Sequence, residues 1–282
     1  MNHLKFENTR VYNFAGAFYG MRNPKNSWHL GDSVFGLRNF REMGFDETNE
    51  VAKDWTIQDG YNPDDESFEE HFLERENWIE ENGILNLNPI QQIAEVAYIG
   101  PKDMKLAQTL IRGGSEHRKF LRQIFVSVDI TAPLFWYKEF DTYKVGTVAN
   151  STSTMHKIAS APITLNNFKF DSDLFDLPLN PKDANEGNFV DAVSDIINAC
   201  EKLRQLYLST NDSRYWKALI EILPESWVQK RTITMNYENL ISMYHQRKSH
   251  KLPEWREDFV EWVKTLPYAN ELILYNDICA DS

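Results

Sequence analysis

The sequence is short of cysteine, of long apolar runs and of net positive charge. Two cysteines occur among 282 residues, Cys200 and Cys279, and they lie far apart. Cys200 falls on an apolar helical stripe and is expected to be a buried thiol, which is typical of a reducing, cytoplasmic setting. No run of 18 or more apolar residues is present, so no membrane-spanning helix is expected. The N-terminus MNHLKFENTRVYNF also lacks the charged-then-apolar pattern of a signal peptide.

The formal net charge is −12, which argues against a groove for a nucleic-acid polymer because such a groove needs a basic face. The charge is uneven, however. Two basic stretches, 112–122 and 229–251, interrupt the acidic chain. Local basic stretches on an acidic protein suit a small anionic ligand better than a polymer, although each could also be a solvated helix face.

Several catalytic and metal-binding signatures are missing. The chain has no GxGxxG after a strand, no GxxxxGK[ST], no HExxH, no GxSxG and no CxxC. The seven histidines do not fall at metal-ligand spacings with carboxylates, so no metal site is expected. No residue is assigned as catalytic, and an enzyme of this sequence would take its chemistry from a cofactor.

Hydrophobic periodicity predicts an α+β fold: one helix-rich domain over residues 1–282 with a modest sheet. An acidic segment at 42–82, with an amphipathic helix at 66–82, is read as an insertion that covers the site or forms a partner surface. Strands are expected within 10–20 and at 124–130, extended chain at 160–170, and loops at 21–33 and 171–188. Helices are expected at 99–114, 132–145, 189–203, 214–224, 235–248 and 253–267.

The stretch EFDTYKVGTVANSTSTMH, residues 139–156, concentrates hydroxyl and amide side chains directly after a Tyr-Lys pair. These groups supply both hydrogen-bond donors and acceptors, as a polar ligand requires. The same composition is also typical of a helix end or a loop.

The order of these features resembles the flavin-dependent thymidylate synthases. In that family a strand leads into an Ala-Pro helix and then the signature RHR-x-x-S-x-N-E-x-S-x-R-Y. Here APLF stands at 132–135, Thr142-Tyr143-Lys144 takes the place of Arg-His-Arg, and Thr147, Asn150 and Ser153 fall at the Ser, Asn and Ser positions. The family's Gly-His segment is similar to GSEHRKF, which carries His117.

A second block of the resemblance lies in the C-terminal half. The family has an N-x-R helix followed, eleven residues after the Asn, by an arginine for the substrate phosphate. Asn236 and Arg247 have this spacing. The departures are Ser151 for the signature Glu, Met155-His156 for Arg-Tyr, and Glu238 for the Arg after Asn236. Only Lys144 keeps a positive charge in the signature triplet.

The resemblance implies an enzyme that methylates dUMP to dTMP with methylenetetrahydrofolate, FAD and NADPH. It implies a homotetramer, because sites of the family form between subunits. Substrate would be bound by Arg247, Lys144, Ser153, Asn150 and Ser151, and flavin by His117, Tyr143, Thr142 and Asn236.

Three alternatives stay open because of the altered signature. The chain could be a variant enzyme that modifies another pyrimidine nucleotide. It could be a non-catalytic nucleotide-binding protein that has lost flavin binding. It could also be a structural helical protein with an accidental likeness, in which case the strand flanked by helices 132–145 and 235–248 would be absent.

Overall fold

The computed structural model describes residues 4–37, 95–183 and 186–280, and it confirms a helix-rich α+β fold. The acidic segment 42–82 and its helix lie outside the described residues. A four-stranded antiparallel sheet has the order β1-β4-β6-β5. Its strands are β1 (Lys5–Tyr12), β4 (Phe125–Pro133), β6 (Val228–Asn236) and β5 (Val148–Ser151). Two further strands, β2 (Val34–Leu37) and β3 (Glu95–Tyr98), form a separate antiparallel pair.

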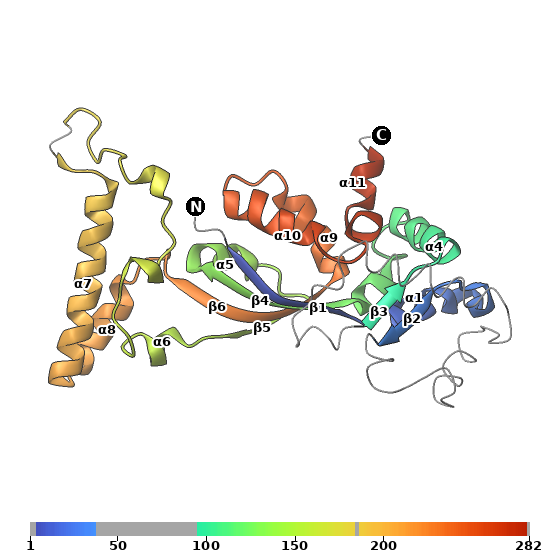
Figure 1. The fold of residues 1–282 in the computed structure, drawn as a ribbon, viewed down its shortest axis with the longest axis horizontal. Helices are drawn as coiled ribbons and strands as arrows, with labels where there is room; N and C mark the ends of the chain where they lie inside the picture. Colours follow the sequence, from blue (N-terminus) through green and yellow to red (C-terminus); the bar gives the residue numbers. More distant parts are fainter. Residues whose placement is uncertain (1–3, 38–94, 184–185, 281–282) are drawn as a thin grey trace.

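One face of the four-stranded sheet is buried. The alternating residues Val126, Val128, Ile130 and Ala132 of β4 are all nearly inaccessible, as expected for a strand with one face against a core. Helices α5, α9 and α10 lie over this face in Figure 1. The core there is aromatic, and the rings of Trp136 and Trp255 stack with centroids 4.3 Å apart.

The helices follow local capping signals. α4 (Pro101–Arg112) begins with Pro101 in its first turn and ends at Gly113. α9 (Tyr237–Arg247) begins with a capping box between Asn236 and Asn239. The other helices outside residues 152–227 are α1 (Phe14–Arg22), α5 (Leu134–Phe140), α10 (Val260–Lys264) and α11 (Tyr275–Ala280). The short 3-10 and π segments in this part of the chain are Asn23–Lys25, Trp28–Leu30, Lys119–Gln123, Glu254–Phe259 and Ala269–Ile273.

Residues 152–227 form a part that projects from the sheet between β5 and β6 (Figure 1). Its helices are α6 (Thr154–Lys157), α7 (Phe189–Thr210) and α8 (Ser213–Ile222), and two 3-10 turns lie at Leu165–Asn167 and Ser172–Leu174. A second, smaller hydrophobic cluster holds this part together around Phe168, Cys200 and Leu219. We call it the projecting part, and the rest the main body.

Several expected boundaries were wrong. Within 10–20 the strand ends at Tyr12, and Phe14–Arg22 is a helix. The 21–33 segment contains 3-10 turns, and the helix expected at 132–145 ends at Phe140. The strand Val228–Asn236 was not expected. The segment 160–170 is extended only in part, since a 3-10 turn at Leu165–Asn167 interrupts it before an isolated bridge at Phe168. The expected helix 99–114 is confirmed as α4, and strand 124–130 as β4.

Candidate functional site

The turn that follows α5, residues 141–147, packs against the start of α9. The Asn239 side-chain amide donates a hydrogen bond to the Val145 carbonyl at 2.7 Å. Gly146 has a φ of +78°, and a Cβ there would lie 2.9 Å from the Asn236 amide nitrogen. Glycine is therefore required by both the backbone conformation and the close approach. The turn joins the two sequence blocks that were expected to share one site.

Arg247 is the centre of the contacts between these blocks. Its Nε donates to the Tyr143 hydroxyl at 2.8 Å, and its Nη2 lies 2.9 Å from Oε2 of Glu139 on α5. The guanidinium also lies over the rings of Tyr143 and Trp255, at 5.3 and 4.9 Å from their centroids. The side chain is 11% exposed. Arg247 is thus held rigidly, and its charge is balanced by Glu139.

Tyr143 connects this arginine to the neighbouring turn of α9. Its hydroxyl donates to Oε1 of Gln246 at 2.9 Å while accepting from Arg247. Burial raises the pKa of Tyr143, and the nearby Arg247 charge opposes that rise. The phenol therefore stays protonated at neutral pH.

Thr142 and Lys144 differ in how free their side chains are. The Thr142 hydroxyl donates to the backbone carbonyl of Glu139 at 2.7 Å, which closes the end of α5. Lys144 is exposed, and its ammonium has no partner among the described residues. Within this network, Lys144 is the cation that remains available to an added anion.

The polar run after the turn forms an edge strand and a helix cap. Asn150 and Ser151 are exposed on β5, opposite Thr232 and Arg231 of β6. Ser153 caps α6, where its hydroxyl accepts from the His156 backbone N–H at 3.2 Å. Among the described residues, no hydrogen bond joins these three side chains to Arg247 or Lys144.

His117 precedes a residue that contacts the first turn of α9. It is exposed in the turn between α4 and the Lys119–Gln123 segment. Its neighbour Arg118 makes a two-pronged ion pair with Glu238, with nitrogen–oxygen distances of 2.8 and 3.2 Å. This ion pair ties the segment before β4 to the first turn of α9.

The pairing of Arg118 with Glu238 was not expected from the sequence, because 120 residues separate the two side chains. A groove of about 380 Å³ runs beside the ion pair, between α9 and the end of the chain. Its polar lining includes Arg118, Glu238, Ser242, His245 and Asp277. Asp277 contacts both His245, at 3.5 Å, and Lys248, at 2.8 Å.

The four residues expected to hold flavin do not form a cradle within one chain. Asn236 is buried, and its side-chain oxygen accepts from the Asn239 backbone N–H at 3.0 Å. Thr142 and Tyr143 are likewise bonded inside the chain. Of these four side chains, only that of His117 has no hydrogen-bond partner among the described residues. The described residues therefore do not fit a flavin as a site of a single chain.

The part of the chain that the structure describes holds neither a clustered metal site nor a membrane-spanning helix. No group of three or more His, Cys, Asp or Glu side chains is placed to hold a metal ion. None of the described helices is long and apolar enough to cross a membrane.

Comparisons with known proteins give partial structural similarities. No family model and no curated protein matches the chain. A solved structure of ThyX from Helicobacter pylori, with FAD and dUMP, is 17% identical, covers 62% of this chain and 82% of its own, and has a TM-score of 0.44. A UMP/dUMP methylase, PolB from Streptomyces cacaoi with 5-Br UMP, is 14% identical, covers 63% and 83%, and has a TM-score of 0.45. Likeness at this level does not establish a function, which has to come from the residues of this chain.

Proposed function

We propose that the protein binds a pyrimidine nucleoside monophosphate and acts on it as an enzyme of the flavin-dependent thymidylate synthase type, methylating dUMP. One observation carries this proposal. The two sequence blocks that resemble the family, about a hundred residues apart, meet directly, because the Tyr143 hydroxyl lies 2.8 Å from Arg247 Nε. A strand followed by α5 and a paired strand followed by α9 bring them together, which argues against an accidental likeness.

In this proposal Arg247 binds the nucleotide phosphate. A phosphate dianion competes with the Glu139 carboxylate for the same guanidinium, since both accept two parallel N–H bonds. Glu139 is 44% exposed and can move toward solvent. Lys144 adds a second positive charge from the adjoining turn, and Asn150, Ser151 and Ser153 offer the donors and acceptors for a pyrimidine edge.

FAD, with NADPH and methylenetetrahydrofolate as cosubstrates, is expected from the resemblance alone. When bound, FAD would supply the hydride relay of the reaction. The side chains proposed to touch it are His117, Tyr143, Thr142 and Asn236. Three of them are hydrogen-bonded within the chain, so a flavin would contact them through their remaining polar atoms. The resemblance places the rest of the flavin site on a partner subunit of a homotetramer.

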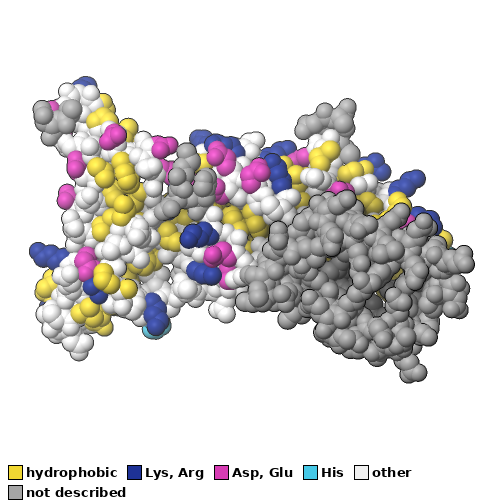
Figure 2. Space-filling model, viewed as in Figure 1, with side chains coloured by type: hydrophobic (Ala, Val, Ile, Leu, Met, Phe, Trp, Pro, Cys, Tyr) yellow, Lys and Arg dark blue, Asp and Glu magenta, His cyan; other side chains and the backbone are white. Residues whose placement is uncertain are grey.

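Exposed apolar side chains suggest where a partner could pack. Figure 2 shows hydrophobic side chains gathered over α7 of the projecting part. Those of Ile196 and Leu208 on α7, and of Leu177 and Leu179 in the preceding loop, are exposed. Contiguous apolar surface of this kind is typical of subunit contacts.

The bonded flavin residues also favour a second candidate: a variant pyrimidine-nucleotide-modifying enzyme or a non-catalytic nucleotide-binding protein without flavin. The two candidates share the phosphate site and differ in cofactor. The visible spectrum after incubation with FAD and desalting separates them. A retained, shifted flavin band supports the first, and a colourless protein that binds dUMP supports the second.

The phosphate site is tested by calorimetric titration of dUMP and deoxyuridine into Glu139→Gln. Removing the competing charge should tighten dUMP binding about tenfold, the effect of roughly one charge-assisted hydrogen bond. Deoxyuridine, which has no phosphate, should be unaffected. Glu225→Gln is the matched control, because Glu225 pairs with Lys138 of the same helix but does not touch Arg247. Equal dUMP affinity in both variants and in the unmodified protein would refute the assignment.

A further inference from the structure

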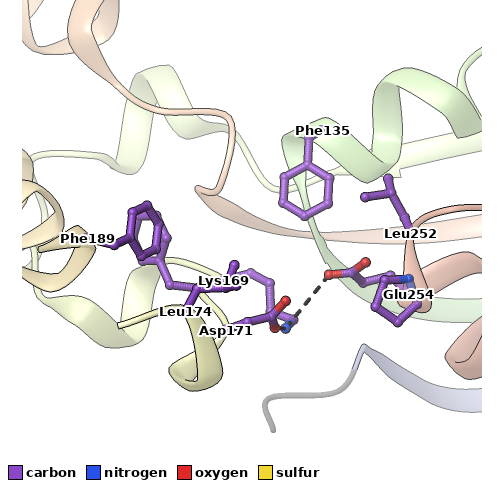
Figure 3. A pocket seen from close by; sticks show the side chains of 9 residues that line it. Phe135, Lys169, Asp171, Leu174, Phe189, Leu252 and Glu254 are labelled. Carbon is purple, nitrogen blue, oxygen red and sulfur yellow. Dashed lines mark hydrogen bonds and ion pairs between the residues drawn. The ribbon is translucent and has the colours of Figure 1, made fainter. Parts of the chain in front are cut away.

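A second pocket, partly open to solvent, lies where the projecting part meets the main body (Figure 3). Its volume is about 190 Å³. Phe135 and Leu252 of the main body face Phe189 and Leu174 of the projecting part across it. The residues that line this pocket include none from α9 and none from the proposed nucleotide site.

The polar floor of this space holds an unusual carboxylate. Glu254 is 4% exposed, and its Oε2 has no hydrogen-bond partner among the described residues. Its Oε1 lies 3.8 Å from Nζ of Lys169, which is itself 9% exposed and ion-paired with Asp171. Figure 3 shows the Glu254 carboxylate pointing into the space, toward Lys169 and below Phe135.

The charges and the unpaired oxygen define the missing group. Two carboxylates, Asp171 and Glu254, surround one ammonium, Lys169, so an added anion is disfavoured. A buried carboxylate oxygen without a donor is costly, because such groups are normally paired or hydrogen-bonded. The completing group is therefore a cationic N–H donor directed at Glu254 Oε2.

We propose that this space binds a small organic cation, an amine or amidine on an apolar body about one ring in size. The aromatic wall of Phe135, Phe170 and Phe189 suits both a ring and a positive charge, since aromatic faces attract cations. A volume of about 190 Å³ limits the ligand to a single ring with its head group. A metal ion is disfavoured, because no third metal-ligating side chain completes the site in the described residues.

Such a ligand would bridge two separately packed cores. Phe135 and Leu252 pack against the aromatic core of the main body, while Phe170 packs against the smaller cluster of the projecting part. The bound cation would fix the position of α7 and its neighbours relative to the sheet. Binding of such a cation would therefore regulate the arrangement of the two parts without occupying the nucleotide site.

The test uses benzamidine as the cationic probe and benzamide as its neutral counterpart, in calorimetric titrations of the whole protein. Benzamidine should bind with one site per chain, and benzamide at least tenfold more weakly. Glu254→Gln should weaken benzamidine binding at least tenfold. Glu257→Gln is the control on the same π-helix turn, because Glu257 is exposed and pairs with Arg256, and it should bind like the unmodified protein.

A second variant locates the site independently of charge. Phe189→Ala removes one ring of the wall and leaves Glu254, Lys169 and Asp171 in place, and it should also weaken benzamidine binding several-fold. Circular dichroism verifies that each variant is folded. The proposal is overturned if the unmodified protein does not bind benzamidine at millimolar concentration. It is also overturned if Glu254→Gln and Phe189→Ala both bind benzamidine as tightly as the unmodified protein does.

Discussion

Asp103, in the first turn of α4, is a buried carboxylate whose removal should lower the stability of the fold strongly. It is 3% exposed. One oxygen accepts from Arg22 Nε at 2.6 Å, and the other accepts from the Ser33 hydroxyl at 2.6 Å and from the backbone N–H groups of Asp32 and Ser33 at 3.1 and 3.0 Å. The network ties α1, the strand pair and α4 together. A carboxylate in a first helical turn is also favourable toward the helix dipole.

The substitution Asp103→Asn keeps the shape but leaves the Arg22 guanidinium buried without a counter-charge. Breaking a buried ion pair from one side costs about 3–5 kcal/mol. Unfolding entropy is about 2.1 cal/mol/K per residue, or about 0.6 kcal/mol/K for 282 residues. The melting temperature should therefore fall by about 5–8 °C.

Scanning calorimetry of Asp103→Asn beside Asp176→Asn measures this effect. Asp176 is exposed in the projecting part, and its substitution should change stability by less than about 0.5 kcal/mol. A shift for Asp103→Asn as small as that of the control would show that the buried network contributes nothing net, and the reasoning from burial would fail.

Two further changes test the projecting part and the turn beside α9. Hydrogen bonds from Arg204 lower the pKa of Glu201 to about 2, so this carboxylate contributes stability above its ordinary pKa near 4.5 that is lost as pH falls toward 2. The urea midpoint of unfolding should depend less on pH across that range for Glu201→Gln than for the unmodified protein. The same pH dependence in both proteins would contradict the assignment. Gly146→Ala should cost about 1–3 kcal/mol in chemical unfolding, because a Cβ would meet the Asn236 amide, whereas Gly114→Ala, also at positive φ but in open space, should cost less. Equal losses would show that the close approach does not matter.

Local signals predicted the helices whose ends are chemically marked. Pro101 and Gly113 frame α4, and the alternation of IFVSVDI matches β4. The prediction of a strand in NFAGAFYG was wrong, because its closely spaced apolar residues match both the repeat of a helix and the repeat of a strand. The turn at Asn13, with φ of 69°, separates β1 from α1, and no short-range pattern required it.

The strand Val228–Asn236 had a visible signal in its own residues. Ile233 and Met235 are buried while Thr232 and Thr234 are exposed, which is the period of a half-buried strand. The stretch 229–251, which contains most of this strand, was interpreted only as a basic region that could bind an anion. Its register with β4 then decides where α9 begins.

The candidate site was predictable only as a meeting of two blocks. Spacing indicated Arg247 and the turn at 142–147, and the structure brings Arg247 to Tyr143. The ion partners Glu139 and Arg118 were not predictable, because each comes from an element that only the tertiary packing brings near. The sequence of one chain shows which residues carry charge but not which charges are already balanced.

The strand order has a consequence for how the chain assembles. The central strand β4 pairs Ile130 with Phe6 on one side and Val128 with Ile233 on the other, contacts between residues roughly a hundred or more apart. Closing such long loops slows folding. During synthesis β4 also has one open edge until the chain has reached residue 236, and an open apolar strand is a site for misassociation. Nascent chains that stop before β6 should therefore depend on chaperones far more than the finished protein does.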